Sequence, residues 1–171
     1  MCGIVGLLVK KPALRSQLGE LMVPMLIGMT ERGPDSAGLA VFTDSLAESS
    51  RKISVYSGLT ADGADFNWQA LGHGIKTHLG VEASVEAKGN HAVITIKGAA
   101  EPVKHWIKEQ HPKLHLLSTG RSIDLYKDIG TPAEVVPPSY TLVSVTAVTV
   151  IGLAVITPVF LLTSISATAA P

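Results

Sequence analysis

The chain has 171 residues, and its 14 basic and 14 acidic side chains give a formal net charge of zero. This balance gives no support for binding to nucleic acid or to an acidic membrane surface, because both favour a basic protein. The single cysteine excludes an internal disulfide framework and a cysteine-based zinc site. An unpaired thiol and an opening run without a cationic leader predict a cytoplasmic location for the amino-terminal part.

The first third of the chain predicts a strand, a helix and two further strands. Residues 3–9 form an apolar run that ends in two lysines and a proline, which is typical of a buried strand. Apolar residues with helical spacing predict a helix over 16–31, and Pro24 should kink it. A Gly-Pro pair then breaks the helix. Residues 38–42 and 52–57 are predicted strands joined by a polar loop.

The middle of the chain predicts alternating helices and strands. A helix is expected over 65–79, and the strict alternation of 91–97 predicts a strand. Residues 101–110 have apolar positions three and four apart, which indicates a helix with one buried face. Residues 114–118 are predicted to be a strand and 122–128 a helix. A Thr-Pro pair then predicts the start of another helix, because proline is favoured in the first turn.

The last part of the sequence changes in composition after Val136. Residues 141–163 carry no charge and are long enough to cross a bilayer at ~20 residues per span. Gly152 and Pro158 lower the helix propensity of this stretch. Three interpretations stay open for residues 136–171: a transmembrane anchor, the out-of-frame translation of a longer gene, and a buried β-rich core segment.

The position of the cysteine is chemically informative, because it is the second residue. Removal of Met1 from a chain with a small second residue leaves a thiol and a free α-amine on Cys2. Both groups titrate close to neutral pH. The neutral amine can therefore accept the thiol proton and later protonate a leaving amine or ammonia. Cys2 is the candidate nucleophile.

Two sequence motifs accompany the candidate nucleophile, and the first of them contains it. Met-Cys-Gly-Ile-Val-Gly at 1–6 leads into the first predicted strand, and Glu-Arg-Gly-Pro-Asp-Ser-Ala-Gly at 31–38 lies between a predicted helix and a predicted strand. In this order they resemble the class II glutamine amidotransferases, a family of amino-terminal nucleophile hydrolases. Residues 118–121 and 126–130 are most similar to the amidotransferase subunits of glutamate synthase-type enzymes, including N-methylglutamate synthase. The resemblance covers residues 1–135.

The resemblance implies a reaction and a set of site residues. Glutamine would be hydrolysed through a thioester on Cys2, and the ammonia would pass to a synthase partner without any cofactor. Arg32, Gly33, Asp35 and Ser36 match the motif that lines the pocket of the nucleophile. The alternative for Arg32 is a cation favoured by the end of a helix. Asp35 and Ser36 have the alternative of being ordinary turn residues.

The resemblance also implies an α+β fold of four layers, in which two antiparallel sheets lie between helices. Residues 1–135 would form a partial amidotransferase domain, with an inserted βαβα-type unit at about 60–112. The family's Gly-His-Thr-Arg and His-Asn-Gly motifs and a later acidic residue are not found after Val135. The sheets are therefore expected to be incomplete.

Two other functions stay open at this point. The chain could be a truncated, catalytically silent protein that associates with a membrane or a partner through its apolar tail, or a cysteine hydrolase that acts on another amide. The six histidines are scattered, so we expect no metal site. The Gly-His-Gly sequence at 72–74 lacks the further glycines and lysine of a phosphate loop.

Overall fold

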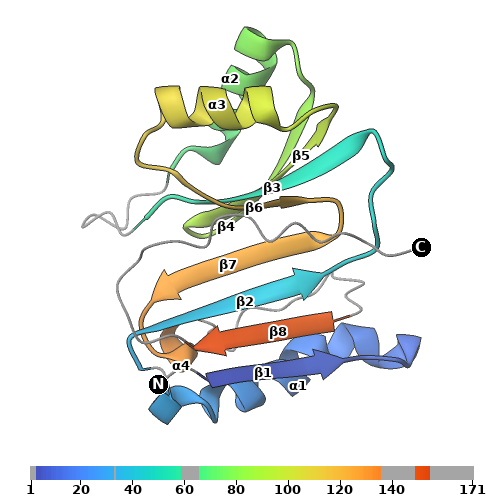
Figure 1. Ribbon diagram of the computed structural model, residues 1–171, viewed down its shortest axis with the longest axis vertical. Coiled ribbons are helices and arrows are strands. Elements are labelled where there is room, and N and C mark those ends of the chain that lie inside the picture. Colours follow the sequence, from blue (N-terminus) through green and yellow to red (C-terminus); the bar gives the residue numbers. More distant parts are fainter. Residues whose placement is uncertain (1–2, 33, 59–65, 136–148, 155–171) are drawn as a thin grey trace.

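A computed structural model describes residues 3–32, 34–58, 66–135 and 149–154, which form two antiparallel sheets and several helices (Figure 1). Sheet A has the strand order β1 (Gly3–Leu8), β8 (Thr149–Ala154), β2 (Ser36–Phe42), β7 (Ile123–Ile129), and sheet B has the order β4 (Ala83–Lys88), β5 (His91–Lys97), β3 (Ser50–Tyr56), β6 (His115–Gly120). The helices are α1 (Leu18–Ile27), α2 (Trp68–Leu79), α3 (Glu101–Gln110), α4 (Pro132–Val135), and the short 3-10 helices are η1 (Pro12–Gln17) and η2 (Thr30–Arg32). The predicted α+β class is confirmed.

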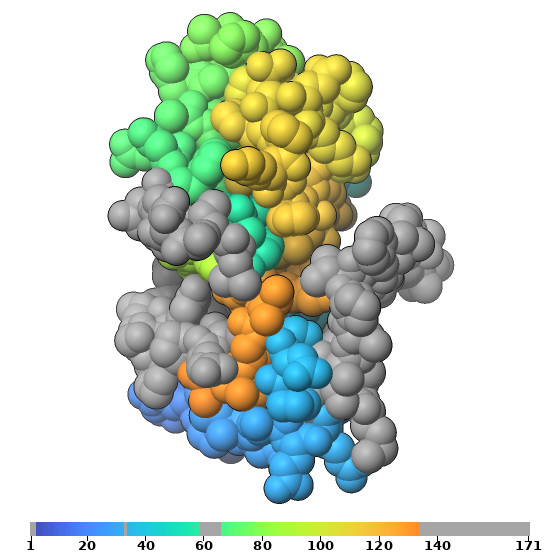
Figure 2. Space-filling view, turned by 90° about the vertical axis from the view of Figure 1, so that its left-hand side faces the viewer, coloured from blue at the N-terminus to red at the C-terminus, as the bar shows by residue number. Residues whose placement is uncertain are grey.

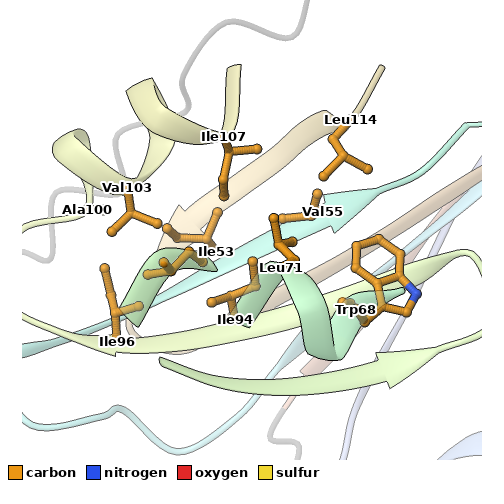
Figure 3. Packing of buried hydrophobic residues seen from close by; sticks show 12 residues of the cluster. Ile53, Val55, Trp68, Leu71, Ile94, Ile96, Ala100, Val103, Ile107 and Leu114 are labelled. Atoms are coloured by element: carbon orange, nitrogen blue, oxygen red, sulfur yellow. The ribbon is translucent and has the colours of Figure 1, made fainter. Parts of the chain in front are cut away.

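Sheet B and its two long helices enclose the larger core (Figure 3). The strands contribute alternate residues, such as Ile53 and Val55, because side chains of a strand point in turn to opposite faces. Val103 and Ile107 lie one turn apart on α3 and are fully buried. Each large aliphatic side chain buried in this way contributes about 1.5–3 kcal/mol. The core therefore fixes α2 and α3 against one face of sheet B.

The bounds of α2 have identifiable local causes. The side chain of Asn67 accepts a hydrogen bond from the N–H of Ala70 at 2.9 Å, which satisfies one of the free donors at the start of the helix. Gly80 ends the helix with a φ of 65°, a left-handed conformation that glycine adopts without steric cost.

A smaller core lies between sheet A and α1. Leu18 and Met22 of α1 are buried with Leu39 and Val41 of β2. The predicted helix over 16–31 is divided into η1, α1 and η2, and α1 ends before Gly28, a residue that disfavours helix. Pro24 lies inside α1, as expected.

One face of sheet A contacts both α1 and sheet B. Leu39 and Tyr126 are register partners, so their side chains lie on the same face. Both belong to a core that also contains Leu18 of α1 and Val93 of β5. Figure 1 shows the two long helices of sheet B and α1 at opposite ends of the molecule. The stacked order of four layers stays a prediction.

The two sheets are joined by neighbouring connections. The chain crosses from β2 to β3 and returns from β6 to β7. The N–H of Thr43 donates to the carbonyl of Ser122 at 2.7 Å, and the N–H of Leu46 donates to the carbonyl of Arg121 at 3.0 Å. In Figure 2 the orange residues, a range that includes β7, lie between the green and yellow residues of sheet B and its helices and the blue residues at the start of the chain.

The prediction of a helix over 122–128 is wrong, because Ile123–Ile129 form β7. Asp124 and Tyr126 of this strand are buried, whereas Ile123 and Leu125 are less so, and this period of two is that of a strand. Strand β4 was not predicted. The described part of the predicted unit at 60–112 has the order helix, strand, strand, helix, so its βαβα-type order is wrong. The boundaries of the unit stay a prediction.

The prediction of a transmembrane helix over 141–163 is wrong for residues 149–154, because they form β8 between β1 and β2. A central strand has neighbours on both sides and favours apolar, β-branched residues such as Val150 and Ile151. The described part of this stretch is therefore a strand, and its other residues lie outside the described ranges. Among the described helices, none has the length and apolar character needed to cross a membrane.

Candidate active site

Four strand ends meet at one end of sheet A. Gly3 at the start of β1 pairs with Ala154, Ala154 pairs with Ala37 of β2, and Ala37 pairs with Asp128 of β7. Glycine and alanine at three of the four positions allow neighbouring backbone to approach closely. Cys2 precedes Gly3 in the chain and lies outside the described residues.

Arg32 lies directly against the first residue of β1. A Cβ atom on Gly3 would lie 2.9 Å from the Cβ of Arg32 and 2.6 Å from the Cε of Met29. Only glycine fits this contact without a shift of the neighbouring chain. The structure thus brings the Arg-containing motif to the residue that follows Cys2 in sequence. The side chain of Arg32 is exposed.

The next part of the motif is held by β7. The carbonyl of Asp35 accepts the N–H of Gly130 at 2.9 Å, and Ser36, which is buried, pairs with Ile129. Asp35 is exposed, and its described hydrogen bond uses its backbone carbonyl. Both observations agree with a turn residue. Gly33 lies outside the described residues. The structure therefore places Arg32, Asp35 and Ser36 at one end of sheet A.

Next to the motif, polar side chains join β7 to sheet B. These residues, called the polar seam, are Tyr56, Asn90, His91 and Asp128. The carboxylate of Asp128 accepts hydrogen bonds from the Tyr56 hydroxyl at 2.7 Å, the Asn90 Nδ2 at 2.7 Å and the N–H of Ile129 at 2.8 Å. Burial, and then the hydrogen bond to Asp128, raise the pKa of the Tyr56 hydroxyl. Tyr56 therefore stays protonated and remains a donor at physiological pH.

His91 extends the seam through both of its ring nitrogens. The Asn90 Nδ2 faces Asp128, so the Asn90 Oδ1 faces the His91 Nδ1 at 2.7 Å, which must carry a proton. The His91 Nε2 lies 3.0 Å from both the backbone nitrogen and the carbonyl oxygen of Lys127. Burial lowers the pKa of His91. Burial, the largest effect, favours the neutral imidazole, while the Lys127 backbone and Asp128 act against it.

The far end of β7 makes a second polar contact with sheet B. The Lys52 Nζ lies 2.9 Å from the Asp124 Oδ1, and the two side chains are only 13% and 9% exposed. Lys52 also donates to the Thr43 hydroxyl at 3.0 Å. Removal of one partner from a buried ion pair is costly because it leaves a charge without compensation. Loss of either partner is therefore expected to destabilise the packing of the two sheets, away from the motif.

The residues of the seam were not predicted as site residues. Tyr56 and Asn90 are distant from Asp128 in sequence, and only the fold brings them together. The alternation of Asp124, Tyr126 and Asp128 along one strand was the available signal. Among the described residues, no three His, Cys, Asp or Glu side chains form a group that could hold a metal ion.

No family model matches the chain. The chain is 39% identical over 138 residues to a glutamine amidotransferase-like protein, GlxB, of Rhizobium meliloti (strain 1021). The aligned part covers 80% of this chain and 44% of that protein, so the chain spans less than half the length of this relative. Most of this chain is therefore similar to part of a glutamine amidotransferase-like protein.

Proposed function

We propose that the chain carries the nucleophile end of a class II glutamine amidotransferase, which releases ammonia from glutamine through a thioester on Cys2. The observation that carries the proposal is the contact of Arg32 with Gly3, because it joins the two motifs at one end of sheet A. The printed name of the relative, a glutamine amidotransferase-like protein, supports glutamine as the substrate.

In the proposed reaction, the α-amine of Cys2 takes the proton of its own thiol. The sulfur attacks the carbon of the glutamine side-chain amide, and the tetrahedral intermediate collapses as the amine returns the proton to the leaving ammonia. Water then cleaves the thioester and releases glutamate and the free thiol. The ammonia passes to a synthase subunit that accepts it.

Arg32, Gly33, Asp35 and Ser36 are proposed to shape the pocket of Cys2. A guanidinium presents five donors in one plane, a geometry that suits a carboxylate ligand. The described contacts support a fixed position for this motif, because β1 limits it on one side and β7 on the other. The proposal predicts that exchange of Arg32 weakens glutamine binding more than it changes the folding of the domain.

The test uses the full chain and a glutamine analogue with a diazo-ketone group, which alkylates an activated thiol. The expected result is one added label on Cys2, together with release of glutamate and ammonia from glutamine. Cys2→Ala is the control, and it should lose both properties while it keeps its far-ultraviolet circular dichroism. Absence of label and of glutamate release in the wild type would reject the proposal and favour a catalytically silent chain.

A further inference from the structure

We propose that Asp128 is a positioning residue, which holds the Asp35–Ser36 part of the motif at a fixed place relative to sheet B. Its effect on catalysis rests on the proposed function, whereas its effect on structure does not. The inference comes from the contacts of a single carboxylate that links three separate segments of the chain.

The carboxylate of Asp128 accepts hydrogen bonds from residues of both sheets. Tyr56 on β3 and Asn90, in the turn before β5, donate to its two oxygens from sheet B, each at 2.7 Å. The N–H of Ile129 donates from sheet A at 2.8 Å. Hydrogen bonds to a charged group are about twice as strong as neutral ones. The end of β7 is therefore tied to sheet B at this residue.

The motif is bound to the residues that directly follow Asp128. Ile129 pairs with Ser36, and the N–H of Gly130 donates to the carbonyl of Asp35. Asp128 itself pairs with Ala37, the next residue of the motif. A shift at the end of β7 would thus be passed to the motif through consecutive backbone contacts.

Asp124 provides a matched control on the same strand. It lies on the same face as Asp128, and its carboxylate also binds a residue of β3, Lys52, at 2.9 Å. Its register partner is Val41, near the other end of β2, so it is distant from the motif along the strand. Loss of either carboxylate removes polar contacts between the sheets, but of the two residues only Asp128 lies beside Asp35 and Ser36.

The first experiment measures amide hydrogen exchange of Gly130 in the wild type, Asp128→Asn and Asp124→Asn under conditions in which all three are folded. Exchange of the Gly130 N–H is expected to be about tenfold faster in Asp128→Asn, since one charged contact is worth about that factor. In Asp124→Asn it should stay within about twofold of the wild type. Equal acceleration in both variants, or none in Asp128→Asn, would overturn the positioning role.

Tyr56→Phe is a second variant, because it keeps the ring and the carboxylate and removes one donor. It should accelerate exchange at Gly130 less than Asp128→Asn does, and it provides the answer if that variant does not fold. Unchanged exchange in Tyr56→Phe would then overturn the role.

The second experiment measures the rate at which the diazo-ketone analogue labels Cys2. The rate should fall about tenfold in Asp128→Asn and stay within about twofold in Asp124→Asn. A wild type that is not labelled rejects the proposed function, while the exchange data still decide the positioning role. A labelled wild type with equal rates in both variants rejects the role of Asp128 alone.

Discussion

Sheets A and B differ in how they are assembled from the chain. Sheet B and its helices use mostly one continuous stretch, from β3 to β6, whereas sheet A takes β1 from the start of the chain and β8 from residues 149–154. The candidate site lies on sheet A, where the strand ends come from four distant segments. Sheet B thus has the larger core, and the sheet that carries the proposed chemistry depends on long-range pairing.

The largest difference between the two sheets is expected from a proline in β8, which should disrupt sheet A and leave sheet B folded. Ile151 pairs with Gly6 of β1 on one side and Ala40 of β2 on the other. Ile151→Pro should cost at least about 1–3 kcal/mol, because proline removes a donor from a central strand and leaves its acceptor unsatisfied. Hydrogen exchange should show loss of protection in β1 and β2 and retention in β3 and β5. Retained protection in β1 would show that β8 does not hold sheet A together.

A smaller effect is expected at the contact between the two motifs. Gly3→Ala places a Cβ 2.9 Å from the Cβ of Arg32, and such overpacking should cost about 1–3 kcal/mol. Gly6→Ala lies at an exposed position of the same strand and is the control. Urea unfolding of both variants measures the difference. A cost for Gly3→Ala no larger than that for Gly6→Ala would contradict the contact.

A pH-dependent effect is expected where the two sheets meet. The pKa of His91 is lowered below 6.5 in the folded state, mainly by burial and against the opposing effects of the Lys127 backbone and Asp128. The unfolded chain then binds the proton first, so stability is complete above pH 6.5 and falls as the pH drops below it. The loss is about 1.4 kcal/mol for each pKa unit of lowering. His91→Gln should flatten the dependence of unfolding free energy on pH between 7.5 and 5, and Asp128, which faces His91, remains in both proteins. An unchanged slope would show that another group titrates.

The smallest effect is expected at the surface of sheet B. Lys76 and Glu82 form an ion pair at 2.9 Å, but their side chains are 63% and 76% exposed. Exposed pairs are weakened by water and salt, so Lys76→Met should leave the midpoint of thermal unfolding unchanged within error. A clear shift in that midpoint would indicate that this pair is better ordered than its exposure suggests.

The sequence predicted local elements better than distant pairing. The bounds of β5 and α3 agree with the predicted 91–97 and 101–110, because a period of two and a period of about 3.6 residues are visible within each segment. The strand β7 was predicted as a helix, and β8 lies in a stretch for which a transmembrane helix was one of three interpretations. Both are strands of sheet A, whose conformation depends on partners elsewhere in the chain.

The motif at 31–38 was visible in the sequence, whereas the residues that hold it in place were not. Arg32 and Ser36 were named from the pattern at 31–38, and the structure places both at the end of sheet A. In the sequence, Asp128 was noted only as part of residues 126–130, which resemble the amidotransferase subunits. Its donors Tyr56 and Asn90 meet it only through the packing of the two sheets. Hydrogen bonds between distant side chains leave no periodic signal in sequence.

The central claim is that the two motifs form one glutamine site around the thiol of Cys2. Its most direct test is intact-protein mass spectrometry after treatment with the diazo-ketone analogue, with and without a large excess of glutamine. The account predicts a single adduct on Cys2 of a chain that lacks Met1, and suppression of that adduct by glutamine. An adduct that forms equally well in the presence of glutamine, or a mature chain that retains Met1, would contradict it.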